Sequence, residues 1–82
     1  MTPSIDVSQL KDIFYRNLVQ EYRREFGNED YHVAQALNLL AGCLLDQNKR
    51  NEAESVLRES LLLANESDKL VAQRLLDIVN GR

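Results

Sequence analysis

The side chains with the most chemical potential in this sequence are a histidine and the acids that precede it. His32 is the only histidine and closely follows Glu29 and Asp30, and clusters of this kind can bind a metal ion or transfer protons. No second histidine and no suitably placed cysteine accompanies it, which argues against a metal site. The acids are better explained as residues that favour the N-terminus of the following helix through its dipole.

Two further side chains, Cys43 and Ser60, have nucleophilic atoms, and both are predicted to be structural. Cys43 is the only cysteine and has no base near it in the sequence, so a packed, inert thiol is expected. Ser60 lies in the tripeptide ESL, which is similar to the Asp-Ser-Leu motif of acyl carrier proteins, but it falls on the inward face of a helix. We therefore predict no catalytic residue, no metal and no cofactor, and expect the chain not to be an enzyme.

The composition is that of a folded domain without affinity for polyanions. The chain has 82 residues, of which 44% are hydrophobic and 28% charged, as in ordinary globular proteins. Its net charge of -3 comes from interleaved acids and bases, so neither nucleic acid nor a membrane is an expected partner. The opening residues MTPSIDVSQL lack the pattern of a signal peptide, and a single cysteine fits a reducing compartment, so a cytoplasmic location is expected.

Apolar residues recur at helical spacing in four segments that are separated by short polar or glycine-containing breaks. The pattern predicts one all-α domain over residues 7–80, with helices at about 7–26, 31–46, 52–64 and 69–80. Each helix is expected to turn one apolar stripe toward the core. The predicted core residues are Val7, Leu10, Phe14, Leu18, Tyr22, Val33, Ala36, Leu37, Leu40, Ala41, Leu44, Ala53, Val56, Leu57, Ser60, Leu61, Ala64, Val71, Leu75, Ile78 and Val79.

The helix ends carry recognisable signals. Asp6, Asn51 and Asp68 are the expected N-caps of the first, third and fourth helices, because their side-chain oxygens can accept a free backbone N–H. Gly27 and Gly81 are the expected stops, because glycine tolerates the positive φ found at helix C-termini.

Two segments of the chain are nearly the same. VAQALNLLAG at 33–42 is followed by VAQRLLDIVNG at 71–81, and aligning them places core positions on core positions. Aligning Val56 with Phe14 has the same effect for the third and first helices. The chain is therefore predicted to be an array of antiparallel helical hairpins, which form a continuous core by stacking.

These repeats resemble the tetratricopeptide repeat family, and within it the longer repeats of the kinesin light chain type. Residues 34–65 look like one full repeat, in which NEAESVL at 51–57 is similar to the start of the second helix. Ala53 is the small residue expected where the two helices cross, and FGNEDYHVAQALNLLA at 26–41 is similar to a junction between repeats. The resemblance implies a short tetratricopeptide-like solenoid of four helices that binds a protein or peptide partner.

The resemblance also implies a concave groove built from the second and fourth helices. The residues expected to line it are Gln35, Asn38, Leu39, Gly42, Leu45, Gln73 and Leu76. Leu39 stands where the subfamily has an asparagine that faces the groove, so an apolar contact is expected there. Leu62 and Leu63 fall outside the main stripes and, like Leu45, are expected to contact a partner.

The leading interpretation is a non-catalytic protein–protein interaction module, a scaffold or adaptor. A purely structural oligomerisation domain and a fragment of a longer repeat array are the alternatives. A homodimer through the first helix is also expected, because its apolar residues surround more of its circumference than one neighbouring helix can cover. The expected self-association contacts are Tyr15, Leu18, Val19 and Tyr22.

Overall fold

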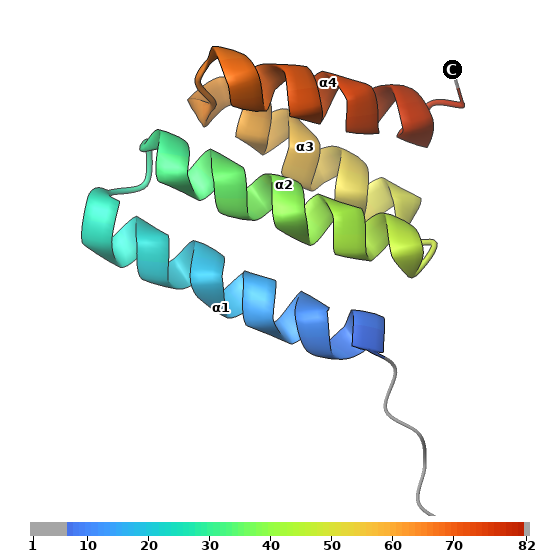
Figure 1. Cartoon of the computed structure of the whole chain (residues 1–82), viewed down its shortest axis with the longest axis horizontal. Coiled ribbons are helices and arrows are strands. Elements are labelled where there is room, and N and C mark those ends of the chain that lie inside the picture. Colours follow the sequence, from blue (N-terminus) through green and yellow to red (C-terminus); the bar gives the residue numbers. More distant parts are fainter. Residues whose placement is uncertain (1–6, 82) are drawn as a thin grey trace, which may run out of the picture.

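Helix α2 (Tyr31–Asp46) lies at the centre of the fold and packs against each of the other helices. The computed structural model describes residues 7–81, in which α1 (Val7–Phe26), α3 (Arg50–Leu63) and α4 (Glu66–Val79) surround it. Consecutive helices run in opposite directions, with α1 beside α2 and with α3 behind α2 and α4 (Figure 1). The described residues contain no strand, so the predicted all-α class with four helices is confirmed.

Helix α2 begins at the predicted residue, and α1 and α4 end at the predicted glycines. Asp30 caps α2 by accepting the backbone N–H of His32 at 2.8 Å. Gly27 ends α1 with a φ of 96°, and Gly81 follows α4 with a φ of 76°, both in the left-handed region that favours glycine. The predicted cap Asp6 lies outside the described residues.

Helix α3 begins earlier than predicted. The carbonyl oxygen of Lys49 already accepts the N–H of Ala53 at 3.0 Å, so the helical hydrogen bonds start there. Lys49 occupies the cap position without a side-chain capping bond, and the predicted cap Asn51 lies inside the first turn.

Helix α4 also begins earlier, at Glu66 rather than near Lys69. Asn65 is the N-cap, and its side-chain oxygen accepts the N–H of Asp68 at 3.0 Å. The prediction of Asp68 as the cap was wrong, because Asn65 offers the same type of acceptor one turn earlier.

The main core lies between α2, α3 and α4. Its buried residues are Leu40, Ala41, Leu44, Ala53, Leu57, Ala72, Leu76 and Val79. Every core residue predicted on α2 is buried, as are Ala53 and Leu57 on α3. Alanines within this cluster allow the helix backbones to approach closely.

Helix α4 turns a slightly different face to the core from the predicted one. Ala72, Leu76 and Val79 are buried, whereas Val71 and Ile78, which the pattern assigned to the core, are exposed. Ala72 has no exposed surface, because its short side chain lets α4 lie close to its neighbours. Val71 and Ile78 flank the buried residues and remain exposed to solvent.

Helix α1 packs with a face that the sequence predicted only in part, since Leu18 and Tyr22 pack against the core as expected. Val19 is buried against Val33, Ala36 and Leu37 of α2. Three residues predicted for the core are instead exposed, namely Val7, Leu10 and Phe14.

A polar network holds this face of α1 in place. Asp12 is buried and accepts hydrogen bonds from Arg16 and, at 3.0 Å, from the side chain of Gln47. Arg16 also pairs with Glu52 of α3. Burial acts to raise the pKa of Asp12, but the hydrogen bonds from Arg16 and Gln47 and the charges of Arg16 and Lys49 outweigh it, so this pKa is lowered. The network therefore stabilises the fold above the ordinary carboxyl pKa, and this stabilisation is lost as the pH falls through the lowered value.

Candidate partner-binding groove

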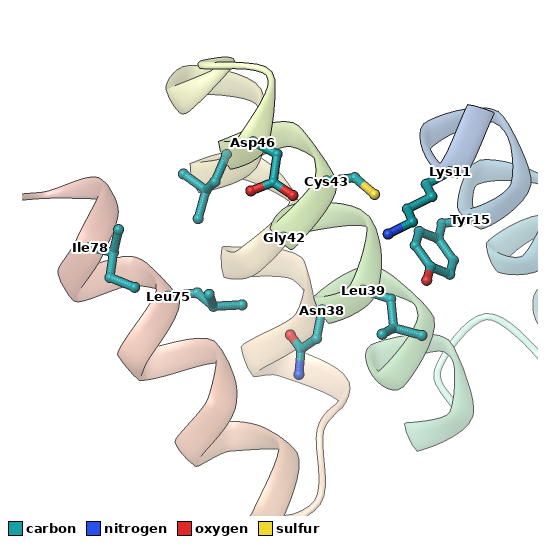
Figure 2. Close-up of a pocket in the computed structure, with 10 residues that line it drawn as sticks. Lys11, Tyr15, Asn38, Leu39, Gly42, Cys43, Asp46, Leu75 and Ile78 are labelled. Atoms are coloured by element: carbon teal, nitrogen blue, oxygen red, sulfur yellow. The ribbon is translucent and has the colours of Figure 1, made fainter. Parts of the chain in front are cut away.

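A groove of about 560 Å³ lies over the exposed face of α2, between α1 and α4. Figure 2 shows Lys11 and Tyr15 lining it from α1, and Leu75 and Ile78 from α4. The residues of α2 that line it are Asn38, Leu39, Gly42, Cys43, Leu45 and Asp46. Its size is within the range of ligand-binding clefts; the wall from α4 is apolar, and the wall from α1 combines the ring of Tyr15 with the charged side chain of Lys11. We refer to it as the α2 groove.

The charged groups of the α2 groove are suited to binding rather than to chemistry. Lys11 and Asp46 place one charge of each sign on the lining, and within residues 7–81 neither of them forms an ion pair. Burial raises the pKa of the Cys43 thiol, against an opposing effect of Lys11. The thiol is therefore neutral and poorly nucleophilic at neutral pH.

The structure places several of the predicted groove residues on this lining and Gln35 beside it. Leu39, Gly42 and Leu45 line the α2 groove, and Gln35 is exposed one turn before Leu39 on the same face of α2. A Cβ added at Gly42 would meet no neighbouring atom within 4 Å, so this glycine leaves open space on the floor. The role of these residues in binding stays a prediction.

On α4 the lining consists of Leu75 and Ile78 rather than the predicted pair. Leu76 is buried in the main core, and Gln73 is exposed but lies outside the lining. The sequence pattern predicted a different orientation of α4, so Gln73 and Leu76 were both assigned to the groove incorrectly. The missed signal was Ala72, whose small side chain marks the side of closest helix approach.

Asn38 lies at the α2 groove, but its amide is used inside the fold. The residue is only 7% exposed. Its Oδ1 accepts the hydroxyl of Ser60 at 2.6 Å, and its Nδ2 donates to the backbone oxygen of Asp68 at 3.1 Å. Asn38 therefore joins α2 to α3 and α4, and its amide is not available to a ligand.

We expect Asn38→Ala to lower the free energy of unfolding by about 1–3 kcal/mol, because it removes two hydrogen bonds and leaves the buried Ser60 hydroxyl only its longer contact with the backbone oxygen of Ala34 at 3.3 Å. Urea unfolding followed by circular dichroism would measure the change. The control is Gln35→Ala, an exposed position on the same helix, which should change stability by less than about 0.5 kcal/mol. Equal unfolding curves for the two variants would show that the Asn38 amide contributes nothing to the fold.

The residues predicted for self-association lie on the side of α1 that faces α2. Val19 is buried, and Tyr15, Leu18 and Tyr22 are half-buried against the core. Val19 is therefore not available to a second copy, and this assignment is corrected. The exposed large apolar residues of α1 outside its last turn, which we call the outer stripe, are Val7, Leu10, Ile13 and Phe14.

The leucines predicted to contact a partner have different surroundings. Leu62 is 85% exposed on α3. Leu63 packs against the cluster around Val19, and Leu45 packs against the main core while lining the α2 groove. Leu62 is thus the one of the three that is fully open to solvent.

His32 belongs to an aromatic cluster at the connection between α1 and α2. Its ring stacks on those of Phe26 and Tyr31, with centroid distances of 4.1 and 4.2 Å, and its Nδ1 lies 2.6 Å from Asp30 Oδ1. The backbone N–H of His32, and then its side chain, lower the pKa of Asp30. Within residues 7–81, no group of three histidine, cysteine, aspartate or glutamate residues could hold a metal ion.

Comparison with known proteins gives no family for the chain. No protein-family model, curated protein or solved structure matches it. In the part of the chain that the structure describes, no helix is both long enough and apolar enough to cross a bilayer. The indication of function therefore lies in the α2 groove itself.

Proposed function

We propose that this chain is a non-catalytic protein–protein interaction module whose α2 groove binds an amphipathic helix of a protein partner. The observation that carries the proposal is Leu39, which is 49% exposed in a groove that Tyr15 and Ile78 line from α1 and α4. Exposed apolar surface within a concave site is typical of a place where another apolar surface binds.

A helical ligand suits this lining better than an extended peptide. An extended peptide brings unpaired backbone N–H and C=O groups, which the groove would have to satisfy. The amide of Asn38 is already engaged by Ser60 and Asp68, and Leu39 offers no hydrogen bond. A helix satisfies its own backbone and needs mainly apolar contacts, with anchors spaced at i, i+3 or i+4, and i+7.

The antiparallel helices and the internal sequence repeat support a tetratricopeptide-like array as the scaffold of this module. In that arrangement α2 and α4 would be corresponding helices of successive repeats, as their similar sequences suggest. We place the module in the cytoplasm, where its single buried cysteine would stay reduced. Its function would be that of an adaptor, with specificity set by the apolar residues of the lining and by Lys11 and Asp46.

The proposal is tested by selecting a displayed library of random helical peptides against the immobilised chain. Enriched peptides should carry apolar residues at helical spacing. Leu39→Glu and Ile78→Glu should each weaken their binding about thirtyfold or more, because each places a charge against the apolar face of the ligand. Gly42→Ala should also weaken binding without destabilising the fold, because its new methyl group occupies open groove space.

The matched control is Gln73→Glu, which adds the same negative charge on α4 outside the lining. At physiological salt, where an exposed charge outside the lining is screened, it should leave binding unchanged within about twofold. Failure to enrich helical peptides, or equal loss of binding in the control, would contradict the proposal.

A structural role in self-association is the second candidate function. The outer stripe favours it, because a run of exposed apolar residues on one helix is unusual for a surface that stays in water. The two roles use adjoining surfaces, since Tyr15 lines the α2 groove and its ring contacts that of Phe14 in the outer stripe.

A further inference from the structure

The outer stripe has the spacing of a helical ligand. Val7, Leu10 and Phe14 follow one another at i, i+3 and i+7, and with Ile13 they are between 51% and 62% exposed. No helix of the described chain covers them, although α1 contacts both α2 and α3 through other residues. Anchors at this spacing are those with which an amphipathic helix binds an apolar groove.

The outer stripe and the α2 groove are continuous on the surface. The rings of Phe14 and Tyr15 meet edge to face, with centroids 5.5 Å apart. Tyr15 also lines the groove together with Leu39. One connected surface therefore contains both the outer stripe and the α2 groove. In a two-fold dimer, the outer stripe of each copy could then contact the α2 groove of the other.

The charges beside this surface are also complementary between two copies. Lys11 lies one turn after Val7 and one turn before Phe14, and is therefore on the same side of α1 as these residues of the outer stripe. Asp46 lies on the lining contributed by α2. Within residues 7–81 neither side chain forms an ion pair, so each is free to pair across an interface.

We propose that the α2 groove is occupied by the outer stripe of a second copy of this chain, and that two copies exchange this contact reciprocally in a closed homodimer. Phe14 of each copy would pack against Leu39 of the other, and Lys11 of each would approach Asp46 of the other. The inference rests on the α2 groove being a docking site for a helix, as proposed above. It differs from stripe-to-stripe pairing, because each contact joins two different surfaces and occurs twice.

The oligomeric state of the full chain tests the proposal. Size-exclusion chromatography with light scattering should give a dimer mass for the wild type at tens of micromolar. Phe14→Glu and Leu39→Glu should each raise the dissociation constant of the dimer about thirtyfold or more, because each puts a charge into both apolar contacts. The control Gln20→Glu adds the same charge at an exposed position of α1 outside the stripe and should remain dimeric.

Mixing the two variants separates reciprocal docking from other dimers. The Leu39→Glu chain keeps its outer stripe, and the Phe14→Glu chain keeps its groove, so a mixed dimer regains one of the two contacts. At a concentration where each variant alone is monomeric, an equimolar mixture should show a population with dimer mass. Stripe-to-stripe pairing would instead leave Leu39→Glu dimeric and would give no gain on mixing, and either result overturns the proposal.

Reversing the charges of Lys11 and Asp46 tests the proposed pairing of these two residues independently. Lys11→Asp should weaken the dimer about three- to tenfold, and the double variant with Asp46→Lys should recover most of that loss, because the pair is restored with reversed signs. Lack of recovery contradicts the pairing of these two residues. A wild type that is monomeric throughout this range, while its groove still enriches helical peptides, would overturn the homodimer and leave the proposed function standing.

Discussion

Leu57→Ala is expected to lower the free energy of unfolding by about 2–5 kcal/mol, because it removes a packed leucine and leaves a cavity. Leu57 has no exposed surface and belongs to the core cluster that joins α3 to α2 and α4. The same cluster contains Ala41, Ala53 and Ala72, whose short side chains cannot move in to fill the space. We therefore expect a value in the upper half of that range.

Urea unfolding followed by circular dichroism would measure this change. With a slope of about 1 kcal/mol per molar urea, typical of a small domain, the midpoint should fall by about 2 M or more. The control is Leu62→Ala on the same helix, where the side chain is 85% exposed and truncation should cost less than about 0.5 kcal/mol. Equal unfolding curves for the two variants would mean that α3 presents a different face to the core.

The loss would be large relative to the whole stability of the fold. A chain of 82 residues has a small core, and domains of this size are stabilised by about 3–5 kcal/mol from that source. Leu57→Ala should therefore leave a substantial unfolded population even without urea. The same limit explains why burial of the outer stripe in a dimer would add significantly to stability.

The core face of α2 could be predicted from the sequence because this helix is covered on most sides. Three helices pack on it, so its apolar residues occupy a broad arc, and a small error in orientation does not expose them. Its remaining exposed face carries Gln35 and Asp46, with Leu39 between them. The resemblance to the repeat family predicted Leu39 outside the core, and its exposure of 49% agrees with that placement.

The orientation of α1 could not be predicted in the same way. Its apolar residues surround most of its circumference, so periodicity allowed either Phe14 or Val19 to face α2. The choice depends on Asp12, whose partner Gln47 lies 35 positions away in the sequence. A buried carboxylate with such partners cannot be recognised until the tertiary contacts are known. The residues of α4 that line the groove were not predicted for a related reason. The orientation of α4 depends on Ala72, which is fully buried but contributes little to the apolar pattern of the sequence.

The packed face of α1 leads to a second large effect. Val19→Glu is expected to lower the free energy of unfolding by about 3 kcal/mol or more, because it buries a charge without a free partner. The nearby Arg16 and Arg23 line the same hollow as Val19. They are already paired with Glu52 and Glu59, so a new carboxylate could bind them only by displacing an existing pair.

Phe14→Glu on the same helix is the matched control, because it introduces the same charge at an exposed apolar position. At concentrations low enough for the wild type to be monomeric, it should change the unfolding free energy by less than about 0.5 kcal/mol. At higher concentrations it should fall below the wild type, because only the wild type gains stability from dimerisation. If Val19→Glu unfolds like the wild type while Phe14→Glu is destabilised at every concentration, then α1 packs through Phe14, and the outer stripe is part of the core.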